Sequence, residues 1–385
     1  MNSDFHYYAT FCASMIAGYS KEEAARIAYS ANFVDCCTVT ILKKCGAPKS
    51  AATTQSNLEL ADFTTDLLGL QEITRIWASF HFLPGDLYAP VDRGCRNYKN
   101  KFRLICKPNG ALVTDTVNLA KNSSLEAVGI AMHVLADTWA HQNFAGTPSL
   151  VINNTEAHVY EMVDGKAYQL SFSHNPGRQD DIEKRKYVNS LSSGSEKSIM
   201  NLGHGRMGHL PDISFIKYKY IPAWGKYAEI IKDNPSDYLH AFGQMVYALK
   251  YLKGINKEFK LNEYDPLEKY KDRVTSIINK RQLSAERDWN AFANELAGCE
   301  VEAFNEKKYI EEYLNHETSS EAPFNQFIYH VLKQKSMVTN RIYKSKNKLA
   351  GYSIEYNGIN FKGLKDYWKF FQHEVIRVKQ NERSK

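Results

Sequence analysis

Three ionisable residues near the middle of the chain are spaced so that they share one face of a helix. His133, Asp137 and His141 follow one another at intervals of four residues. At a rise of about 1.5 Å per residue, this interval places neighbours roughly 6 Å apart along one stripe of a helix. Neutral imidazole nitrogen and carboxylate oxygen are ligands that zinc accepts, and a carboxylate between two imidazoles can bridge two ions. The spacing therefore predicts a metal site on this helix.

The residues around this stripe are apolar or small, among them Ala131, Leu135 and Trp139. Ionisable groups on a buried face are costly without a partner, and a divalent cation supplies one. An ordinary interpretation competes with this one, because a histidine on an apolar face is more often hydrogen-bonded within a core than bound to a metal. The helix alone leaves both interpretations open.

Further imidazoles and carboxylates occur in segments that flank other expected helices. They are Asp4, His6, Asp35, His81, His204, His209 and Asp212. The last three lie in the segment NLGHGRMGHLPD, whose glycines allow tight turns, so His209 and Asp212 could reach one ion and His204 could replace His209. Cys36 and Cys37 adjoin Asp35, but we favour an inert role for these thiols.

Five segments that carry these residues also occur in a characteristic order. They are DFHYY, FVD, FHFLPG, HVLADTWAHQNFAG and GHGRMGHLPD. Over about residues 4–215 the chain resembles an uncharacterised, DUF6765-like bacterial family that is distantly similar to the zinc-dependent phospholipase C and P1 nuclease superfamily. Members of that superfamily hold up to three zinc ions in a helical bundle and cleave phosphate esters, and the resemblance implies the same layout here.

The resemblance implies a role for each ligand of the first two ions. His81, His133 and Asp137 would hold one ion. Asp137 would also bridge to a second ion, which His6 and Asp4 would hold from the start of the chain. The secreted members of the superfamily use an N-terminal amino group at this ion after removal of a signal peptide. Because this sequence starts without a signal peptide, Asp4 is expected to substitute.

The resemblance also implies a third ion and a group that acts on the attacking water. His141, His209 and Asp212 would hold the third ion, although His141 follows the helix aspartate more closely than is usual in the superfamily. Asp35 would be a metal ligand or the catalytic base that orients the water. Zinc lowers the pKa of such a water and offsets charge at phosphorus.

The elements that must position these residues are expected to be mostly helices. Apolar residues recur with helical spacing at 4–18, 57–79, 124–143, 235–253, 265–297 and 363–381. Capping boxes are expected at Ser20 with Glu23 and at Ser123 with Glu126. We expect a loop at 41–56, irregular or partly extended structure with a hairpin turn at Pro108 in 86–120, and an irregular insertion with a short β-hairpin at about 149–200.

The expected fold is therefore mainly α, a multi-helix bundle resembling the phospholipase C and P1 nuclease fold with a small β-hairpin insertion and extra C-terminal helices. We expect residues 1–255 to form the metal-binding domain and 256–385 a C-terminal helical extension packed on it or a subdomain. The chain has 385 residues, 43% hydrophobic and 24% charged, which disfavours disorder.

The absence of membrane-spanning and signal-peptide patterns and the number of cysteines indicate which classes of protein are disfavoured. No apolar run approaches the roughly 18–20 residues that span a bilayer, and no basic segment precedes an apolar one at the start, so a cytoplasmic protein is expected. The cysteines number 7, an odd count without repeated CxxC pairs, which argues against a disulfide framework or a thiolate zinc knuckle.

These patterns favour a zinc phosphoesterase that uses metal-activated water on a lipid headgroup, a nucleotide or nucleic acid. The alternative is a metal-stabilised binding protein without catalysis, which would contact nucleic acid or a protein through basic C-terminal helices. Residues 333–348 contain basic side chains and no acid, so they form either a solvated face or a phosphate-facing patch. The sequence has no HExxH signature, but an amide hydrolase remains an alternative. Mn, Ni or Fe could bind to these ligands in place of zinc.

Overall fold

The structure is a computed structural model of the chain. It describes residues 1–63, 67–89, 101–148, 150–155, 158–175, 177–191, 202–222, 228–315 and 319–347. The described part is mainly helical with two small sheets, which confirms the expected mainly α class. Within these ranges, every helix is too short or too polar to cross a lipid bilayer. The helix expected at 363–381 and the basic residue Lys348 lie outside the described residues.

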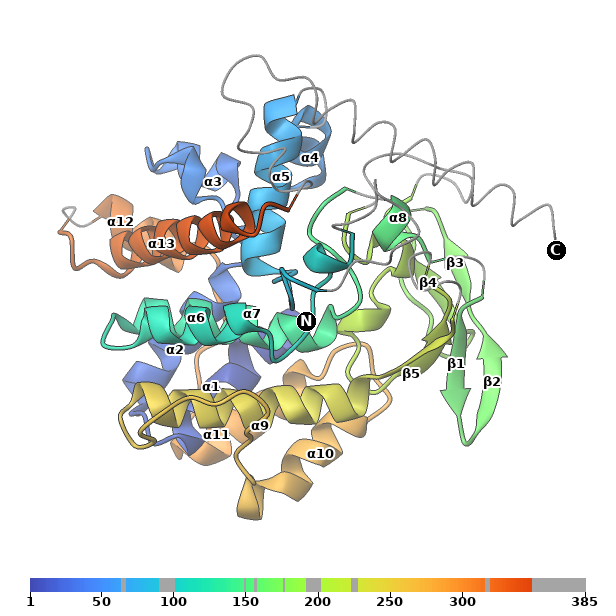
Figure 1. Ribbon diagram of the computed structural model, residues 1–385. Helices are drawn as coiled ribbons and strands as arrows, with labels where there is room; N and C mark the ends of the chain where they lie inside the picture. The colour runs from blue at the N-terminus through green and yellow to red at the C-terminus, as the bar shows by residue number, and fades with distance from the viewer. Residues whose placement is uncertain are drawn as a thin grey trace.

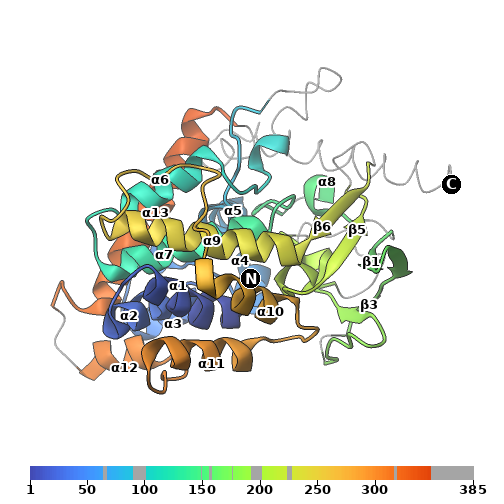
Figure 2. The same cartoon turned by 90° about the horizontal axis from the view of Figure 1, so that it is seen from below.

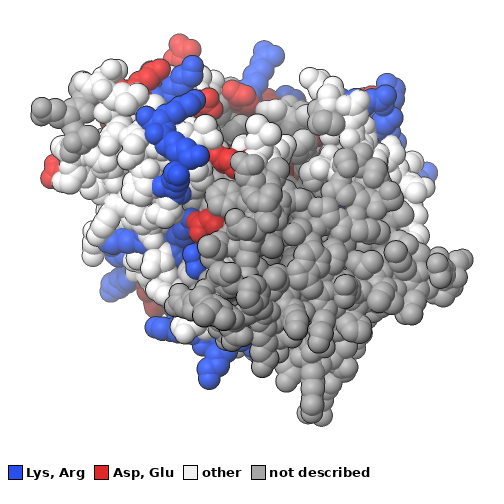
Figure 3. Space-filling view, turned by 90° about the horizontal axis from the view of Figure 1, so that it is seen from above, with Lys and Arg blue, Asp and Glu red and all other residues white. Residues whose placement is uncertain are grey.

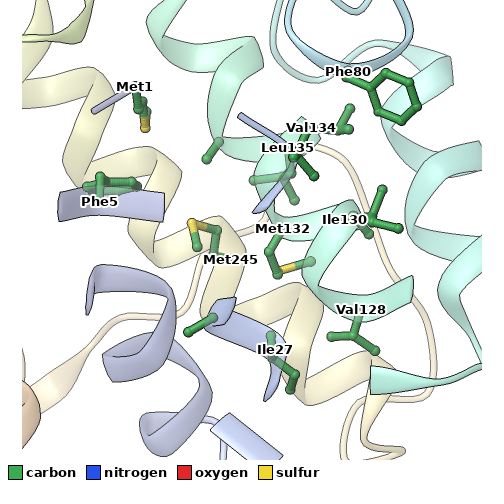
Figure 4. Packing of buried hydrophobic residues seen from close by; sticks show 14 of the residues in the cluster. Met1, Phe5, Ile27, Phe80, Val128, Ile130, Met132, Val134, Leu135 and Met245 are labelled. Carbon is green, nitrogen blue, oxygen red and sulfur yellow. The ribbon is translucent and has the colours of Figure 1, made fainter. Parts of the chain in front are cut away.

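Helix α7 (Leu125–Ala140) is the centre of the bundle. It packs against α2 (Lys21–Phe33), α5 (Leu67–Phe80), α6 (Ala111–Ala120) and α9 (Asn234–Leu252), and also against α13 (Pro323–Lys344). Its residues from 126 to 140 are all buried. Figure 4 shows its side chains pointing to neighbours on several sides. A helix that is covered all round must be apolar all round, so the ionisable residues within it need partners.

The start of α7 differs slightly from the expectation. Ser124, and not Ser123, is the N-cap, and its hydroxyl accepts from the backbone N–H of Ala127. Glu126 is turned away from the cap and accepts two hydrogen bonds from Arg26 of α2. The capping box expected at Ser20 with Glu23 is confirmed at the start of α2.

A glycine allows α2 and α7 to approach closely. A Cβ atom at Gly129 would lie 2.4 Å from the carbonyl oxygen of Ile27 and 2.9 Å from the backbone nitrogen of Ala31. Only a residue without a side chain fits this crossing. The close approach brings the backbone of α2 within hydrogen-bonding distance of the side chains of α7.

The first half of the chain is more helical than the sequence indicated. Its further helical elements are η1 (Phe5–Ala9, a π-helix), α1 (Thr10–Ile16), α3 (Val39–Lys44), η2 (Lys49–Ala51), α4 (Asn57–Phe63) and η4 (Lys101–Leu104). Residues 41–56 were expected to be a loop but include most of α3 and η2. The extended structure expected after Pro108 is wrong, because α6 begins at Ala111. Its buried residues recur with helical spacing, but its valines and threonines favour strands and obscured that pattern.

The second half adds helices around the bundle (Figures 1 and 2). They are α10 (Lys271–Asn279), α11 (Glu286–Ala297) and α12 (Lys308–Asn315), besides α9 and α13, whereas the short helix α8 (Leu150–Asn153) lies near the sheet. The segment 265–297 forms two helices and not one. Helix α11 packs on η1 and α1 at the start of the chain, while α13 packs on α5 and α7. The division at residue 255 stays a prediction.

A small antiparallel sheet lies at one end of the bundle (Figure 2). Its strands are β1 (Tyr160–Val163), β2 (Lys166–Gln169), β5 (Lys217–Tyr220) and β6 (Ile230–Asp233), in the order β2-β1-β5-β6. Strands β3 (Ser171–Ser173) and β4 (Lys186–Val188) form a separate parallel pair. The β-hairpin expected in the insertion is confirmed, but it belongs to a larger sheet because β1 also pairs with β5.

The basic residues near the C-terminal helices do not act as one uniform patch. Lys335 is buried on α13 and pairs with Glu72 of α5, and Arg341 pairs with Asp115 of α6. Lys333 lies over the ring of Tyr329. In Figure 3, lysine and arginine side chains follow a broken line with acidic side chains beside it. Part of the basic stretch therefore stabilises the bundle.

Candidate metal centre

Imidazoles and carboxylates from distant segments meet beside the C-terminal half of α7. They are His6 in η1, Asp35 in the turn after α2, His81 just after α5, His133 and Asp137 within α7, His141 at its C-cap, and His204 and Asp212 beside the 3-10 turns η5 (Gly205–Met207) and η6 (Leu210–Asp212). The structure thus brings together seven of the residues predicted as ligands with His204, which the sequence offered as an alternative to His209.

These side chains form three groups that could each hold a metal ion, and the first two share His133. The groups are His6, His133 and Asp137; Asp35, His81 and His133; and His141, His204 and Asp212. Within each group the ligand atoms lie within 4.8 Å of one another. Two ligands of one tetrahedral zinc lie about 3.4 Å apart when each bond is about 2.1 Å. Several nitrogen–oxygen distances within the centre fall close to that value.

Asp137 lies between several imidazoles of the centre, and its two oxygens face different partners. Its Oδ1 atom lies 3.1 Å from Nε2 of His6. Its Oδ2 atom lies 3.2 Å from Nδ1 of His81 and 3.2 Å from Nε2 of His133. Its side chain is only 1% exposed. A carboxylate with ligands on both sides has the arrangement needed to bridge two cations.

The outer nitrogen of each of two imidazoles is held by a backbone carbonyl group. Nδ1 of His133 lies 2.9 Å from the carbonyl oxygen of Ala31, and Nε2 of His81 lies 2.9 Å from that of Thr53. A carbonyl oxygen can only accept, so each of these nitrogens must carry the proton and donate it. In the neutral rings, the inner nitrogens are then unprotonated. They face each other at 3.3 Å.

The same arrangement occurs at the other end of the centre. Nδ1 of His141 donates to the carbonyl oxygen of His81 at 2.7 Å, and Nδ1 of His204 donates to that of Gly208 at 2.8 Å. Their Nε2 atoms are 3.0 Å and 3.6 Å from oxygens of Asp212. Four imidazoles therefore direct acceptor nitrogens toward one another or toward carboxylate oxygens.

Acceptor atoms that face one another repel unless a cation lies between them. A proton or a metal ion can fill this role. Metal-binding histidines almost always donate their other N–H group to a carbonyl or a carboxylate, which fixes the ring and its tautomer. The donor set and its outer hydrogen bonds therefore fit a divalent transition metal such as zinc.

His6 approaches from the opposite side on a π-helical turn. Its Nε2 atom is 3.1 Å from Asp137 and 3.9 Å from Asp35, and its ring stacks on that of His133 at 3.9 Å between centroids. Its Nδ1 atom is buried and has no hydrogen-bond partner among the described residues. Burial lowers the pKa of His6 to about 4, so the ring is neutral at pH 7 and available as a ligand.

A glycine-dependent turn positions His204. Gly208 has a φ of 55°, and a Cβ atom there would lie 2.1 Å from the carbonyl oxygen of Val188. A side chain at this position would be both strained and in collision with the backbone. Since the carbonyl group of Gly208 holds His204, this turn fixes the ring at the third group. Burial lowers the pKa of His204 to about 4, so it is also neutral at pH 7.

The carboxylates stay ionised although they are buried. Burial opposes ionisation of Asp137, but the neighbouring His141 and the Met1 amino group hold its pKa well below the usual range. Burial also opposes a charge on His81, yet its hydrogen bond with Asp137 and the charge of Asp35 raise its pKa. Without a metal, the amino group of Met1 compensates part of this negative charge, and a proton and a metal ion would compete for His81.

The amino group of Met1 is a member of the centre that we did not assign from the sequence. It donates to Oδ1 of Asp137 at 2.7 Å and lies 3.2 Å from both Oδ1 of Asp212 and Nε2 of His141. Burial opposes its charge, but Asp137 and Asp212 raise its pKa to about 11. The amino-group ligand of the secreted superfamily members was the available signal, and we expected Asp4 in its place.

Two predicted ligands lie outside the groups. Asp4 accepts hydrogen bonds from the backbone N–H groups of Phe5 and Ala285. His209 pairs with Asp180 at 2.8 Å, and its side chain is 61% exposed. His209 points away because the turn at Gly208 directs His204, and not His209, toward Asp212. Cys36 also lies outside the groups and contacts the carbonyl oxygen of Asn32.

Asp35 gives the centre its opening to solvent. Its side chain is 37% exposed, whereas the side chains of His204 and Asp212 are 17% and 12% exposed and the other members are buried. It lies 3.7 Å from Nδ1 of His81 and 3.9 Å from Nε2 of both His6 and His133. Asp35 is therefore the member of the centre with the most exposed side chain.

Comparison with known proteins identifies a family but no activity. The model of a family of unknown function, DUF6765, matches residues 1–380. No curated protein and no solved structure matches the chain.

Proposed function

The chain belongs to the DUF6765 family, and from the geometry of its metal centre we propose that it is a metal-dependent hydrolase, specifically a zinc phosphoesterase. Because the family's function is unknown, the proposal depends on the site. The single observation that carries it is the convergence of acceptor nitrogens from His81, His133, His141 and His204, each fixed by a backbone carbonyl group. Such nitrogens are suited to bind a cation.

The first ion would be held by His81, His133 and Asp137, as the resemblance to the superfamily implies. Asp137 would share its other oxygen with a second ion that His6 binds. Asp35 lies near the nitrogens of all three histidines and could join either ion.

The third ion would be held by a different set from the one expected. His141 and Asp212 remain, but His204 takes the place of His209. The amino group of Met1 lies within reach of the same ion and of the second one. One to three ions are therefore compatible with the ligands.

The arrangement supports hydrolysis better than a purely structural metal. Structural zinc sites are closed by four protein ligands, whereas catalytic sites keep a position for water. The exposed edge of Asp35 leaves such a position accessible. A bound zinc would supply an activated water and a positive charge for the transition state. Asp35 is placed to orient the water and accept its proton.

The substrate class rests on the order of the ligands along the chain. That order resembles the one in the phospholipase C and P1 nuclease superfamily, whose members cleave phosphate esters, and a helical bundle resembling theirs is part of the same proposal. A lipid headgroup, a nucleotide and nucleic acid are all compatible with it.

Hydrolysis of bis-p-nitrophenyl phosphate by zinc-loaded protein tests this function. We expect turnover in the wild type and its loss in Asp137→Asn and Asp35→Asn, with Asp35→Asn retaining metal. His209→Asn, which alters an imidazole outside the groups, is the matched control and should keep activity. A wild type that binds zinc fully but hydrolyses no phosphate ester would contradict the proposal and favour a metal-stabilised binding protein.

A further inference from the structure

The ligand His6 is held in a different way from the ligands of α7. His133 and Asp137 are fixed by a helix that is buried on all sides. His6 lies close to the start of the chain, where backbone segments are poorly ordered unless they are anchored. The position of its ring therefore depends on whatever anchors residues 1–9.

Asp4 anchors this segment through both of its oxygens. Oδ1 accepts from the backbone N–H of Phe5 at 2.7 Å, and Oδ2 accepts from the backbone N–H of Ala285 at 2.6 Å. Ala285 immediately precedes α11. The side chain of Asp4 is buried, so both bonds are shielded from water.

Helix α11 and the segment after it contact the residues on both sides of His6. The ring of Phe5 packs edge-on against that of Trp289, with 5.9 Å between centroids. The hydroxyl group of Tyr7 donates to the carbonyl oxygen of Glu302 at 2.9 Å. A segment 280 residues away in sequence thus forms the support on which the His6 turn lies.

We propose that Asp4 is a positioning residue that fastens the N-terminal segment to the start of α11, and that this bond controls occupancy of the metal site that includes His6. Asp4 touches no ion in this account. The inference rests on the proposed metal-binding function for its effect on ions. The hydrogen bond from Ala285 to Asp4 does not depend on metal binding. The anchoring of the N-terminal segment and its effect on metal occupancy can therefore be tested separately.

Two pairs of variants test the bond from opposite ends. Asp4→Ala removes both acceptor oxygens, whereas Asp4→Asn keeps one. Ala285→Pro removes the donor N–H group, whereas Ala285→Gly keeps it and serves as the matched control. Far-UV circular dichroism should first show that each variant retains its helices.

Hydrogen exchange of metal-free protein is the first measurement. We expect faster exchange across residues 5–9 in Asp4→Ala and Ala285→Pro, with Ala285→Gly unchanged and Asp4→Asn intermediate. Exchange within α7 should not change. Equal protection of residues 5–9 in wild type and both disrupting variants would overturn the anchoring role.

Zinc titration of the apoprotein is the second measurement. Loss of a residue that orients metal ligands typically weakens metal affinity by about 10- to 100-fold. We expect such a loss for one ion in Asp4→Ala and Ala285→Pro, with the affinity for the ion at His81 and His133 retained. Unchanged affinities in both variants would overturn the inference and leave the proposed function standing. A wild type that binds no zinc would overturn the proposed function instead.

Discussion

Buried carboxylates are compensated in two different ways in the sheet and in the helical centre. Glu161 of β1 is 2% exposed and pairs with the guanidinium groups of Arg185 and Arg281. Asp137 of α7 is buried as deeply, but imidazoles and the amino group of Met1 surround it. Among the described residues, no lysine or arginine side chain forms an ion pair with Asp137, Asp35 or Asp212.

This difference separates a structural pair from a candidate metal site. A guanidinium group is always charged, so Glu161 is compensated at every pH at which the protein folds. An imidazole with a low pKa is neutral at pH 7 and offers an acceptor nitrogen where a carboxylate needs a donor. In the helical centre, the amino group of Met1 supplies one positive charge and a bound metal ion would supply more, whereas the sheet pairs its carboxylate with guanidinium groups.

Removing one carboxylate from each region should have the largest effect and should separate them. We expect Asp137→Asn to weaken zinc binding by at least about 100-fold, because it replaces the shared ligand oxygen with an amide. Glu161→Gln should leave zinc binding unchanged and destabilise the fold by about 1–3 kcal/mol. Zinc titration of both variants would measure their zinc affinity, and urea unfolding would measure their free energy of unfolding. Equal zinc affinity in wild type and Asp137→Asn would contradict the assignment of Asp137 to a metal site.

Zinc itself should stabilise the wild type by a smaller amount. Free zinc at 100 times its dissociation constant stabilises a folded protein by about 2.7 kcal/mol, because it binds the native state alone. We expect an upward shift in the thermal midpoint of wild type and of Glu161→Gln, reversed by a chelator. Asp137→Asn should show a smaller shift, because His141, His204 and Asp212 could still hold an ion. A chelator-insensitive wild type would contradict the metal-dependent account.

The stability of metal-free protein should rise with pH between about pH 4 and 6.5. His6 and His204 have pKa values of about 4 in the folded chain, below the 6.5 of an unfolded histidine. In this window the unfolded state binds more protons, so each group adds about 1.4 kcal/mol of stability per pH unit. The pKa of His81 is raised in the folded chain, so protonation of His81 stabilises the fold. This stabilisation is complete below pH 6.5 and is lost only as the pH rises above that value.

Urea unfolding in chelator at pH 4.5, 5.5 and 6.5 would measure that slope. His204→Asn should flatten it, whereas Glu161→Gln should shift the curve without changing the slope. A wild-type slope of zero or of opposite sign would show that these imidazoles are not neutral in the folded protein.

The smallest effect on stability and zinc binding is expected for His209, which we predicted from the sequence to be a metal ligand. His209 is mostly exposed and pairs with Asp180, so His209→Ala should change stability by less than about 1 kcal/mol and leave zinc stoichiometry unchanged. His204→Ala should remove one equivalent of zinc. Metal analysis of both variants distinguishes the two imidazoles, and the reverse result would assign the third group to His209.

The sequence was sufficient to locate α7 and the ligands it carries. Apolar periodicity around His133 and Asp137 indicated a buried helix, and the four-residue spacing indicated one face. The mainly α class followed from the same periodicity, and the first hairpin of the sheet followed from short alternating stretches within residues 149–200. Helix α6 did not, because β-branched residues gave its helical pattern the appearance of a strand.

The identity of ligands outside α7 depended on features that spacing does not encode. The choice between His204 and His209 is set by the left-handed backbone at Gly208. The role of Asp4 is set by a contact with Ala285, far along the chain. The outer hydrogen bonds of His81 and His133 go to backbone carbonyl groups, which no residue type reveals.

An anomalous difference map from a crystal grown with zinc tests the central claim most directly. The account predicts at least one peak about 2.0–2.2 Å from the inner nitrogens of His81 and His133 and from Asp137, with the Ala31 and Thr53 carbonyl bonds intact. A map without a peak at these atoms, from protein saturated with zinc, would contradict it.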